Sequence, residues 1–313
     1  MLNRRHLRVK VLEALYAYHQ NDGKDIASNE KLLIGQVHKV YELYLYLLSL
    51  PIEVVLFASR DAADRAARHI QTAEDGIPAL KITQNALILL MQEHPQLKKA
   101  MKAYKIHHDD DQDTVRALFK EFRNTPEFGV YSNQEAHSFG EDQEIIQLLF
   151  KKIICRSPLI EQLMEERNIS WPVDRDVIEG MVNKTFKTAA LPAGIQLLDL
   201  TSNWEEDEDY IRRLFRLTLE NEKVYEALIA DKTENWEVDR IALMDTLLMK
   251  MALCEMMNFP SIPVKVSINE YIDISKEFST PKSKTFINGI LDKILIDIKG
   301  SGSLNKTGRG LLE

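Results

Sequence analysis

The segment "IPVKVSINEYIDISKEFSTPKSKTFINGILDKIL" (262–295) predicts two helices joined by a short turn. Pro260 and Pro263 separate it from the preceding helix, and Thr280 with Pro281 has the pattern of an N-cap followed by the first helical residue. In the second helix, apolar residues recur at the spacing of one buried face, namely Ile287, Ile290, Leu291, Ile294 and Ile298. The segment therefore predicts an α-helical fold.

Beside that buried face, Lys282, Phe286 and Lys293 share one flank of the helix, and Gly289 leaves its backbone open to approach. An aromatic ring between lysines suits the stacking of an unpaired nucleic-acid base. The alternative is that Phe286 is a residue at the periphery of the core. Spacing alone leaves both interpretations open.

Upstream, "WEVDRIALMDTLLMKMALCEMMNF" (236–259) is apolar almost all the way round a helix, which is typical of a buried central helix. Asp245, Lys250 and Glu255 interrupt it at intervals of five residues, so they point in different directions around the axis. Buried charges need partners. Structural ion pairs are the first expectation for these residues, and a protein interface is the second.

A basic helix is predicted at residues 4–20. Its core-facing stripe comprises Leu7, Val11, Ala14, Leu15 and Tyr18, and the opposite face comprises Arg5, Val9, Leu12 and Tyr16. Arg4, Arg5, Arg8 and Lys10 precede the first acid, Glu13, in a chain with 48 acidic and 40 basic side chains. Basic residues among apolar and aromatic ones suit a nucleic-acid backbone or a partner protein. The alternative is a solvated helix end with stray arginines.

The whole chain reads as nearly all-α. It has 313 residues, 45% of them hydrophobic, with only 12 glycines and 10 prolines, and 3.6-residue periodicity dominates. We predict helices at 4–20, 29–49, 52–73, 83–104, 112–123, 141–155, 158–167, 173–188, 207–221, 222–231, 236–258, 264–278 and 281–298. Residues 124–142 and 188–207 read as linkers. The tail 300–313 reads as disordered.

Several function classes find no support in the pattern. Lys10 and Glu13 interrupt the apolar part of a signal peptide, no later stretch has the length of a membrane span, and two cysteines fit a reducing cytoplasm. The run "HHDDDQD" (107–113) reads as a solvated helix-capping turn rather than a metal cluster. No Gly-rich cofactor loop follows a strand. We therefore expect a cytoplasmic protein that is not an enzyme, with no cofactor, no metal and no catalytic residues.

Three stretches together resemble the NusB transcription antitermination family: "RRHLRVKVLEALYAY" (4–18), "YEALIADKTENWEVDRIALMDTLLMKMALCE" (225–255) and the segment 262–295. The elements IP-x-K-V-x-INE and F-x-NG-x-LDK follow M-A-x-x-E at the family's spacing. The resemblance covers roughly residues 1–20 and 205–298. It implies an all-helical, non-enzymatic protein that binds single-stranded boxA RNA with the ribosomal protein NusE and joins elongating RNA polymerase.

Carried onto this sequence, the resemblance implies two sets of RNA contacts, which are Arg4, Arg5 and Arg8 in the first helix and Lys282, Lys284 and Phe286 in the last. It also implies a NusE contact formed by Tyr16 and Asp245. The implied division of the chain is a basic helix (1–20), an inserted helical domain (21–204), a NusB-like module (205–299) and a tail (300–313).

A different class of function stays open beside this one. The chain could be an accessory RNA-binding or scaffold protein in ribosomal RNA processing or modification. A scaffold that binds only proteins would leave the amino-terminal arginines and the lysines around Phe286 unexplained.

Overall fold

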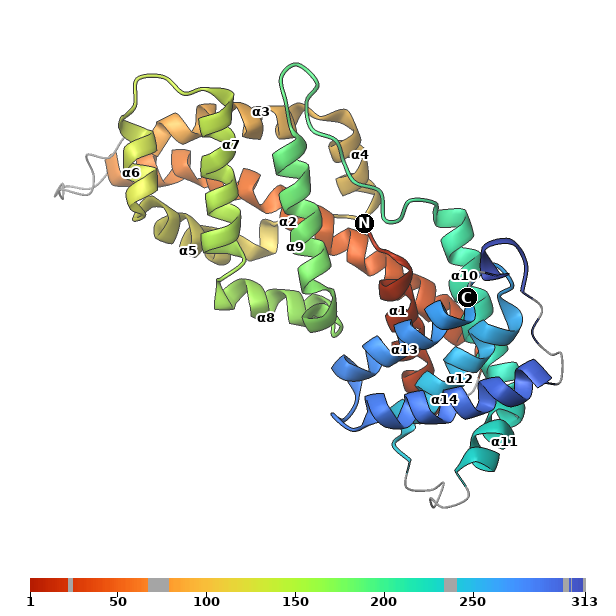
Figure 1. Cartoon of the computed structure of the whole chain (residues 1–313). Helices are drawn as coiled ribbons and strands as arrows, with labels where there is room; N and C mark the ends of the chain where they lie inside the picture. Colours follow the sequence, from red (N-terminus) through yellow and green to blue (C-terminus); the bar gives the residue numbers. More distant parts are fainter. Residues whose placement is uncertain (22–24, 67–78, 234–240, 301–303, 305, 312–313) are drawn as a thin grey trace. The chain divides into compact units, whose positions relative to one another are not determined.

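The computed structural model describes residues 1–21, 25–66, 79–233, 241–300, 304 and 306–311. In these residues every regular element is a helix, and an isolated bridge between Ala190 and Gly194 is the nearest approach to a sheet. The prediction of an all-α fold is therefore confirmed. The chain divides into two compact units (Figure 1), unit 1 with Met1 and His38–Leu200, and unit 2 with Leu2–Val37 and Thr201–Glu313.

Unit 2 is built around α12 (Leu243–Asn258). Helices α1 (Arg4–Gln20), α10 (Trp204–Glu220), α11 (Glu222–Lys232), α13 (Val264–Phe278) and α14 (Ser283–Gly300) all pack against it (Figure 1). Every residue from Leu247 to Met256 is buried, including the charged Lys250 and Glu255. This confirms the prediction of a buried central helix for the part of 236–258 that the structure describes, which begins at 241.

Helix α1 is more deeply buried than its pattern predicts. It packs against α10, α12 and α13, which cover more than one of its sides. Val9 and Leu12, predicted on the outward face, are 6% and 0% exposed, whereas Tyr16 on that face is 39% exposed. The expectation of a largely open second face was wrong because three helices, not one, contact α1.

The last two helices follow the turn signals closely. Pro263 precedes the first residue of α13, whose bounds are those predicted. Helix α14 begins at Ser283, two residues after the predicted start, and buries the predicted stripe from Ile287 to Ile298. This pair of helices, both in contact with α12, completes the core of unit 2.

Unit 1 contains the part of α2 (Ile26–Ala66) that follows Val37, and shorter helices packed around it and one another. These are η2 (Ala79–Gln84), α3 (Ala86–Glu93), α4 (Pro95–Ala103), η3 (Asp109–Asp111), α5 (Gln112–Arg123), α6 (Pro126–Asn133), α7 (Phe139–Leu148), the π-helical η4 (Leu149–Ile154), α8 (Pro158–Arg167) and α9 (Trp171–Thr188). Edge-to-face contacts of Phe128 with Phe119 and Phe122 join α5 and α6 in its core.

Three elements of unit 1 differ from the prediction. Pro51 lies inside α2, where a break was predicted, because the neighbouring Leu47, Leu48, Val54 and Val55 are buried and their packing outweighs one lost backbone hydrogen bond. The predicted linker 124–142 contains α6, capped by Thr125. The predicted helix 83–104 is divided where Asn85 and His94 cap α3 and α4.

One helix, within α2 at Ile26–Ala63, is long and apolar enough to cross a membrane by length and composition alone. The expectation that no stretch has this length was wrong. Most of its apolar window is buried inside the protein, as in the core helix of a soluble domain.

The segment 107–113 is less solvated than predicted. His108 is buried beside Ser49, whose Oγ lies 2.8 Å from His108 Nε2. The Asp111 carboxylate does not cap a helix but accepts hydrogen bonds from Tyr46 and Arg167. Within the described ranges, no group of three or more His, Cys, Asp or Glu side chains could hold a metal ion.

Part of the predicted disordered tail has a defined position in unit 2. The Lys306 ammonium donates to the carbonyl oxygens of Glu255 and Phe259, and the Thr307 N–H donates to the Pro260 carbonyl. The 3₁₀ turn η6 (Gly308–Leu311) follows these contacts. A lysine is suited to this place because a cation near the carboxyl-terminal end of a helix interacts favourably with its last carbonyls.

Candidate functional site

The centre of the candidate site in unit 2 is the buried carboxylate of Glu255. Arg8 on α1 donates to both of its oxygens, through Nε at 2.9 Å and Nη2 at 2.8 Å. Hydroxyl groups of Tyr210, Ser267 and Tyr271 donate to the same carboxylate at 2.5, 2.7 and 3.2 Å. One side chain of α12 thereby joins α1, α10 and α13.

The electrostatics of this cluster favour the ion pair. Burial alone would raise the pKa of the Glu255 carboxyl, but the hydrogen bonds and charge of Arg8, with the Tyr210 and Ser267 hydroxyls, hold that pKa below its ordinary value. The pKa of Arg8 is raised despite burial, because Tyr210 and Glu255 favour its charged form. Both groups are charged at neutral pH. The prediction of a structural ion pair for Glu255 is confirmed.

This pairing changes the interpretation of Arg8. Its side chain is 4% exposed and lies against Glu255, with Glu270 at 3.5 Å. A phosphate reaching it would have to leave a buried carboxylate unpaired, at a cost of several kcal/mol. We therefore withdraw Arg8 from the predicted RNA contacts.

The other amino-terminal cations also have acidic partners. Arg4 pairs with Glu206 and Asp207 on α10 at 2.6 and 2.9 Å. Arg5 pairs with Glu270 and Asp273 on α13, each at 2.9 Å. The side chains of Arg4 and Arg5 remain 34% and 43% exposed, unlike that of Arg8. The positive charges of Arg4, Arg5 and Arg8 are thus largely neutralised by carboxylates that are distant in the sequence.

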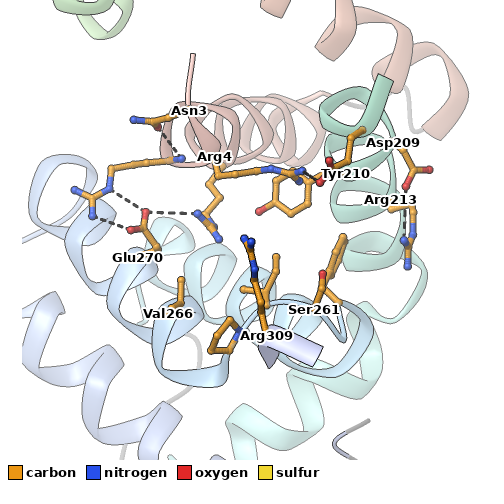
Figure 2. Close-up of a pocket in the computed structure, with 15 residues that line it drawn as sticks. Asn3, Arg4, Asp209, Tyr210, Arg213, Ser261, Val266, Glu270 and Arg309 are labelled. Atoms are coloured by element: carbon orange, nitrogen blue, oxygen red, sulfur yellow. Dashed lines mark hydrogen bonds and ion pairs between the residues drawn. The ribbon is translucent and has the colours of Figure 1, made fainter. Parts of the chain in front are cut away.

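Arg4, Arg5 and Arg8 line a pocket of about 840 Å³ within unit 2. Figure 2 shows the pocket between α1, α10 and α13, with the carboxyl-terminal tail on one side. The Arg4 guanidinium lies over the Tyr210 ring at 4.3 Å, and that of Arg213 lies over Phe259 at 5.0 Å. The remaining lining residues are Asn3, Glu206, Asp209, Ser261, Ile262, Pro263, Val266, Glu270 and Arg309.

The second predicted set of RNA contacts does not line this pocket. Lys282 and Lys284 are exposed at the start of α14, and Phe286 is half-buried. Ser283 between the two lysines is buried. The structure therefore leaves the lysines open to a ligand, while a half-buried Phe286 is compatible with either of its two interpretations.

The predicted NusE contacts differ in accessibility. Tyr16 is 39% exposed. Asp245 is 7% exposed, and its carboxylate accepts hydrogen bonds from the hydroxyls of Ser279 and Ser283. These bonds fix the turn between α13 and α14, so we assign Asp245 a structural role in positioning Lys282 and Lys284.

The third charge of α12 is also paired. The Lys250 ammonium lies 2.6 Å from Glu222 and 2.7 Å from Glu226, both on α11. His19 of α1 contacts the same Glu222 at 2.8 Å, and this hydrogen bond raises the pKa of His19. The expectation of a structural ion pair holds for Lys250 as it does for Glu255.

Sequence reasoning missed Tyr210, Arg213, Phe259 and Arg309 as lining residues of the pocket. The four residues come from α10, the turn after α12 and the tail, and no local pattern connects these segments. One available signal was the pair of arginines, Arg212 and Arg213, in a helix whose first turn is strongly acidic.

Comparison with known proteins identifies the domain. The NusB family model matches residues 181–295. Among curated relatives, the transcription antitermination protein NusB of Salinibacter ruber is 46% identical over 104 residues, which are 33% of this chain and 65% of that protein. The protein of the same name from Chloroherpeton thalassium is 42% identical over 106 residues, 34% of this chain and 50% of that protein.

A third relative, the NusB protein of Natranaerobius thermophilus, is 38% identical over 85 residues, or 27% of this chain and 61% of that protein. The chain thus spans between half and two thirds of the length of these relatives. No solved structure matches the chain. Residues 181–295 are therefore a NusB-family domain within a longer chain, whose regular elements are helices wherever the structure describes it.

Proposed function

We propose that this protein is a transcription antitermination factor, a cytoplasmic adaptor that binds a boxA-like single-stranded RNA together with the ribosomal protein NusE. The RNA-bound pair would then join the elongating RNA polymerase. The proposal rests on the NusB-family match and on the names of the relatives. An adaptor of this kind needs no catalytic residues and no cofactor.

One observation of the structure carries the RNA-binding part. Arg4 and Arg5 stand at the wall of a large pocket in unit 2 and remain partly exposed. Three of their carboxylate partners, Glu206, Glu270 and Asp273, are at least partly exposed, and only Asp207 is buried. Exchange of a carboxylate for a phosphate therefore costs less here than at the buried Arg8. These two arginines are the proposed phosphate contacts.

Lys282 and Lys284 form the second part of the proposed RNA surface, with Phe286 as a base-stacking platform. The lysines are exposed, and the hydrogen bonds from Ser279 and Ser283 to Asp245 support the turn before them. A pre-ordered turn lowers the entropy lost when RNA binds. Tyr16 is the proposed contact for NusE, since an exposed aromatic is a common anchor at protein interfaces.

We propose that the helical insertion, predicted at residues 21–204, corresponds to unit 1 from His38 to Leu200, because residues up to Val37 and from Thr201 belong to unit 2. The proposed role of this insertion is that of a scaffold for further contacts. Deletion of this insertion should leave RNA binding by the remaining module in place and remove only contacts that unit 1 itself makes.

Binding of a boxA-bearing single-stranded RNA, with a scrambled RNA of equal composition as control, tests the proposal. The full chain should prefer the boxA RNA, and addition of NusE should increase that preference. Arg4→Ala/Arg5→Ala should reduce the dependence of log K on log salt by roughly 1.4, since each phosphate contact with a single strand contributes about 0.7. Equal binding of both RNAs with and without NusE would refute the proposed function.

A further inference from the structure

The carboxyl-terminal tail supplies part of the wall of the pocket in unit 2. Arg309 belongs to η6 and lines the pocket, while its neighbour Gly310 is buried. Figure 2 shows the Arg309 side chain extending into the pocket beside Ser261 and Val266. The NusB-family match ends at residue 295, so this part of the wall lies outside the matched domain.

The docking of the tail is specific in its chemistry. Lys306 donates to two carbonyls at the end of α12, and the Thr307 N–H donates to the Pro260 carbonyl at 3.0 Å. Gly310 then approaches Pro260 so closely that a Cβ atom would lie 1.8 Å from the Pro260 carbonyl oxygen. Only glycine fits this approach, and the residue that it positions next to the pocket is Arg309.

The charges around the pocket differ in how far they are compensated. Arg4 and Arg5 pair with two carboxylates each, Arg8 pairs with Glu255, and Arg213 lies 3.6 Å from Asp209. Arg309 is exposed. Unlike the other four arginines that line the pocket, Arg309 has no carboxylate within ion-pair distance among the residues that the structure describes.

We propose that the docked tail delivers Arg309 as a further phosphate-binding cation of this pocket, in addition to Arg4 and Arg5. The proposal rests on the proposed RNA-binding function and deepens it. A phosphate reaching Arg309 displaces no carboxylate, whereas one reaching Arg4 or Arg5 competes with an existing ion pair. The RNA contact of this chain therefore extends beyond its NusB-family domain to residues 306–311.

The pocket also limits the kind of phosphate that fits. Glu206, Asp209 and Glu270 line it together with the arginines. The five lining arginines are largely compensated by these carboxylates and by Asp207, Glu255 and Asp273, so the pocket offers little net positive charge and suits a singly charged group better than a dianion or a triphosphate. The ligand of Arg309 is thus an internal phosphodiester of single-stranded RNA rather than a terminal phosphate or a free nucleotide.

Salt titrations of binding to a boxA-bearing RNA test the proposal with four proteins. These are the wild type, Arg309→Ala, Gly310→Val, which prevents docking, and Arg156→Ala, which removes an exposed arginine of unit 1 as a matched control. Arg309→Ala should reduce the salt slope by about 0.7 and weaken binding roughly three- to five-fold near 0.15 M salt. Gly310→Val should give the same loss, with no further loss in the double variant, and Arg156→Ala should leave the slope unchanged.

Three outcomes would overturn the inference while the proposed function stands. The first is an unchanged slope in Arg309→Ala when Arg4→Ala/Arg5→Ala reduces it. The second is full binding by Gly310→Val, which would mean that Arg309 does not need the docked position. The third is tighter RNA binding after truncation at Gly300, which would identify the tail as a block of the pocket. Failure of the wild type to bind the RNA would instead refute the proposed function itself.

Discussion

Arg8 and Glu255 are 247 positions apart in the chain and form a buried, two-point ion pair in unit 2. The pair joins the amino-terminal helix to the central helix, and Tyr210 on α10 donates to the same carboxylate. Arg8, which the family resemblance assigns to RNA, is thus part of the core. The ion pair holds α1 in place together with the apolar face of that helix.

Loss of Arg8 should be costly for stability. Arg8→Ala leaves the Glu255 carboxylate buried without its cation, so we expect the free energy of unfolding to fall by about 3 to 5 kcal/mol. Arg5→Ala, whose ion pairs are exposed, should cost less than about 1 kcal/mol. Urea denaturation followed by circular dichroism measures both. Equal losses in the two variants would contradict the structural role of Arg8.

Local patterns predicted the elements well where each helix carries its own signals. The predicted bounds of α5, α8 and α13 agree with the structure, since apolar periodicity marks each helix and a proline stands at the start of α8 and directly before α13. Helix α6 was missed because "NTPEFGVYSN" is rich in loop-forming residues, although Thr125 and Pro126 form a standard helix start. The break predicted at Pro51 was wrong because tertiary burial outweighs local propensity.

The candidate site was less predictable than the fold. Charges on α12 were recognised as needing partners, but the partner of Glu255 is in α1 and that of Lys250 is in α11. The spacing of apolar residues along a helix does not indicate which residues of another helix will form an ion pair with it. The same limit applies to Arg309, whose position depends on a tail that composition alone predicts to be disordered.

Acid should destabilise unit 1 through His108. Burial lowers the pKa of His108 to about 4, and its Nδ1 has no hydrogen-bond partner among the described residues. Because this folded pKa lies below the ordinary value of about 6.5, the contribution to stability is present above pH 6.5 and is lost as pH falls toward 4. We expect a loss of roughly 2 to 4 kcal/mol over this range.

Replacement of the histidine tests this pH dependence. His108→Gln removes the titrating group, so the stability of unit 1 should vary less between pH 6.5 and 4 than in the wild type. His107→Gln changes the adjacent, largely exposed histidine and serves as the control. Hydrogen exchange of unit 1 amides as a function of pH gives the comparison. An unaltered pH profile in His108→Gln would assign the acid sensitivity to another group.

Replacement of Phe286 distinguishes the two interpretations of this side chain in α14. As a stacking platform, Phe286→Ala should weaken RNA binding by about 1 to 3 kcal/mol with little loss of stability. As a core residue, the same change should cost about 3 to 5 kcal/mol of folding free energy. We expect the first result, because the ring is half-buried between exposed lysines. RNA titration and equilibrium unfolding of this variant decide between them, and a large stability loss with RNA affinity intact would refute the platform.

Tyr16 should contribute to partner binding and little to folding. Tyr16→Ala should weaken the complex with NusE by about 1 to 3 kcal/mol while leaving the melting temperature nearly unchanged. Tyr18, which is 9% exposed on the same helix, is the matched control, and Tyr18→Ala should lower the melting temperature instead. Calorimetric titration with NusE and a thermal melt of each variant provide the data. A large drop in melting temperature for Tyr16→Ala would mean that this ring stabilises the core.

The most direct test of the central claim is the affinity of the full chain for boxA-bearing single-stranded RNA, measured with and without NusE against a scrambled RNA. The account predicts a preference for the boxA RNA that increases when NusE is present, and a salt dependence that decreases when Arg4 and Arg5 are replaced. Binding that does not discriminate between the two RNAs, with NusE making no difference, would contradict it.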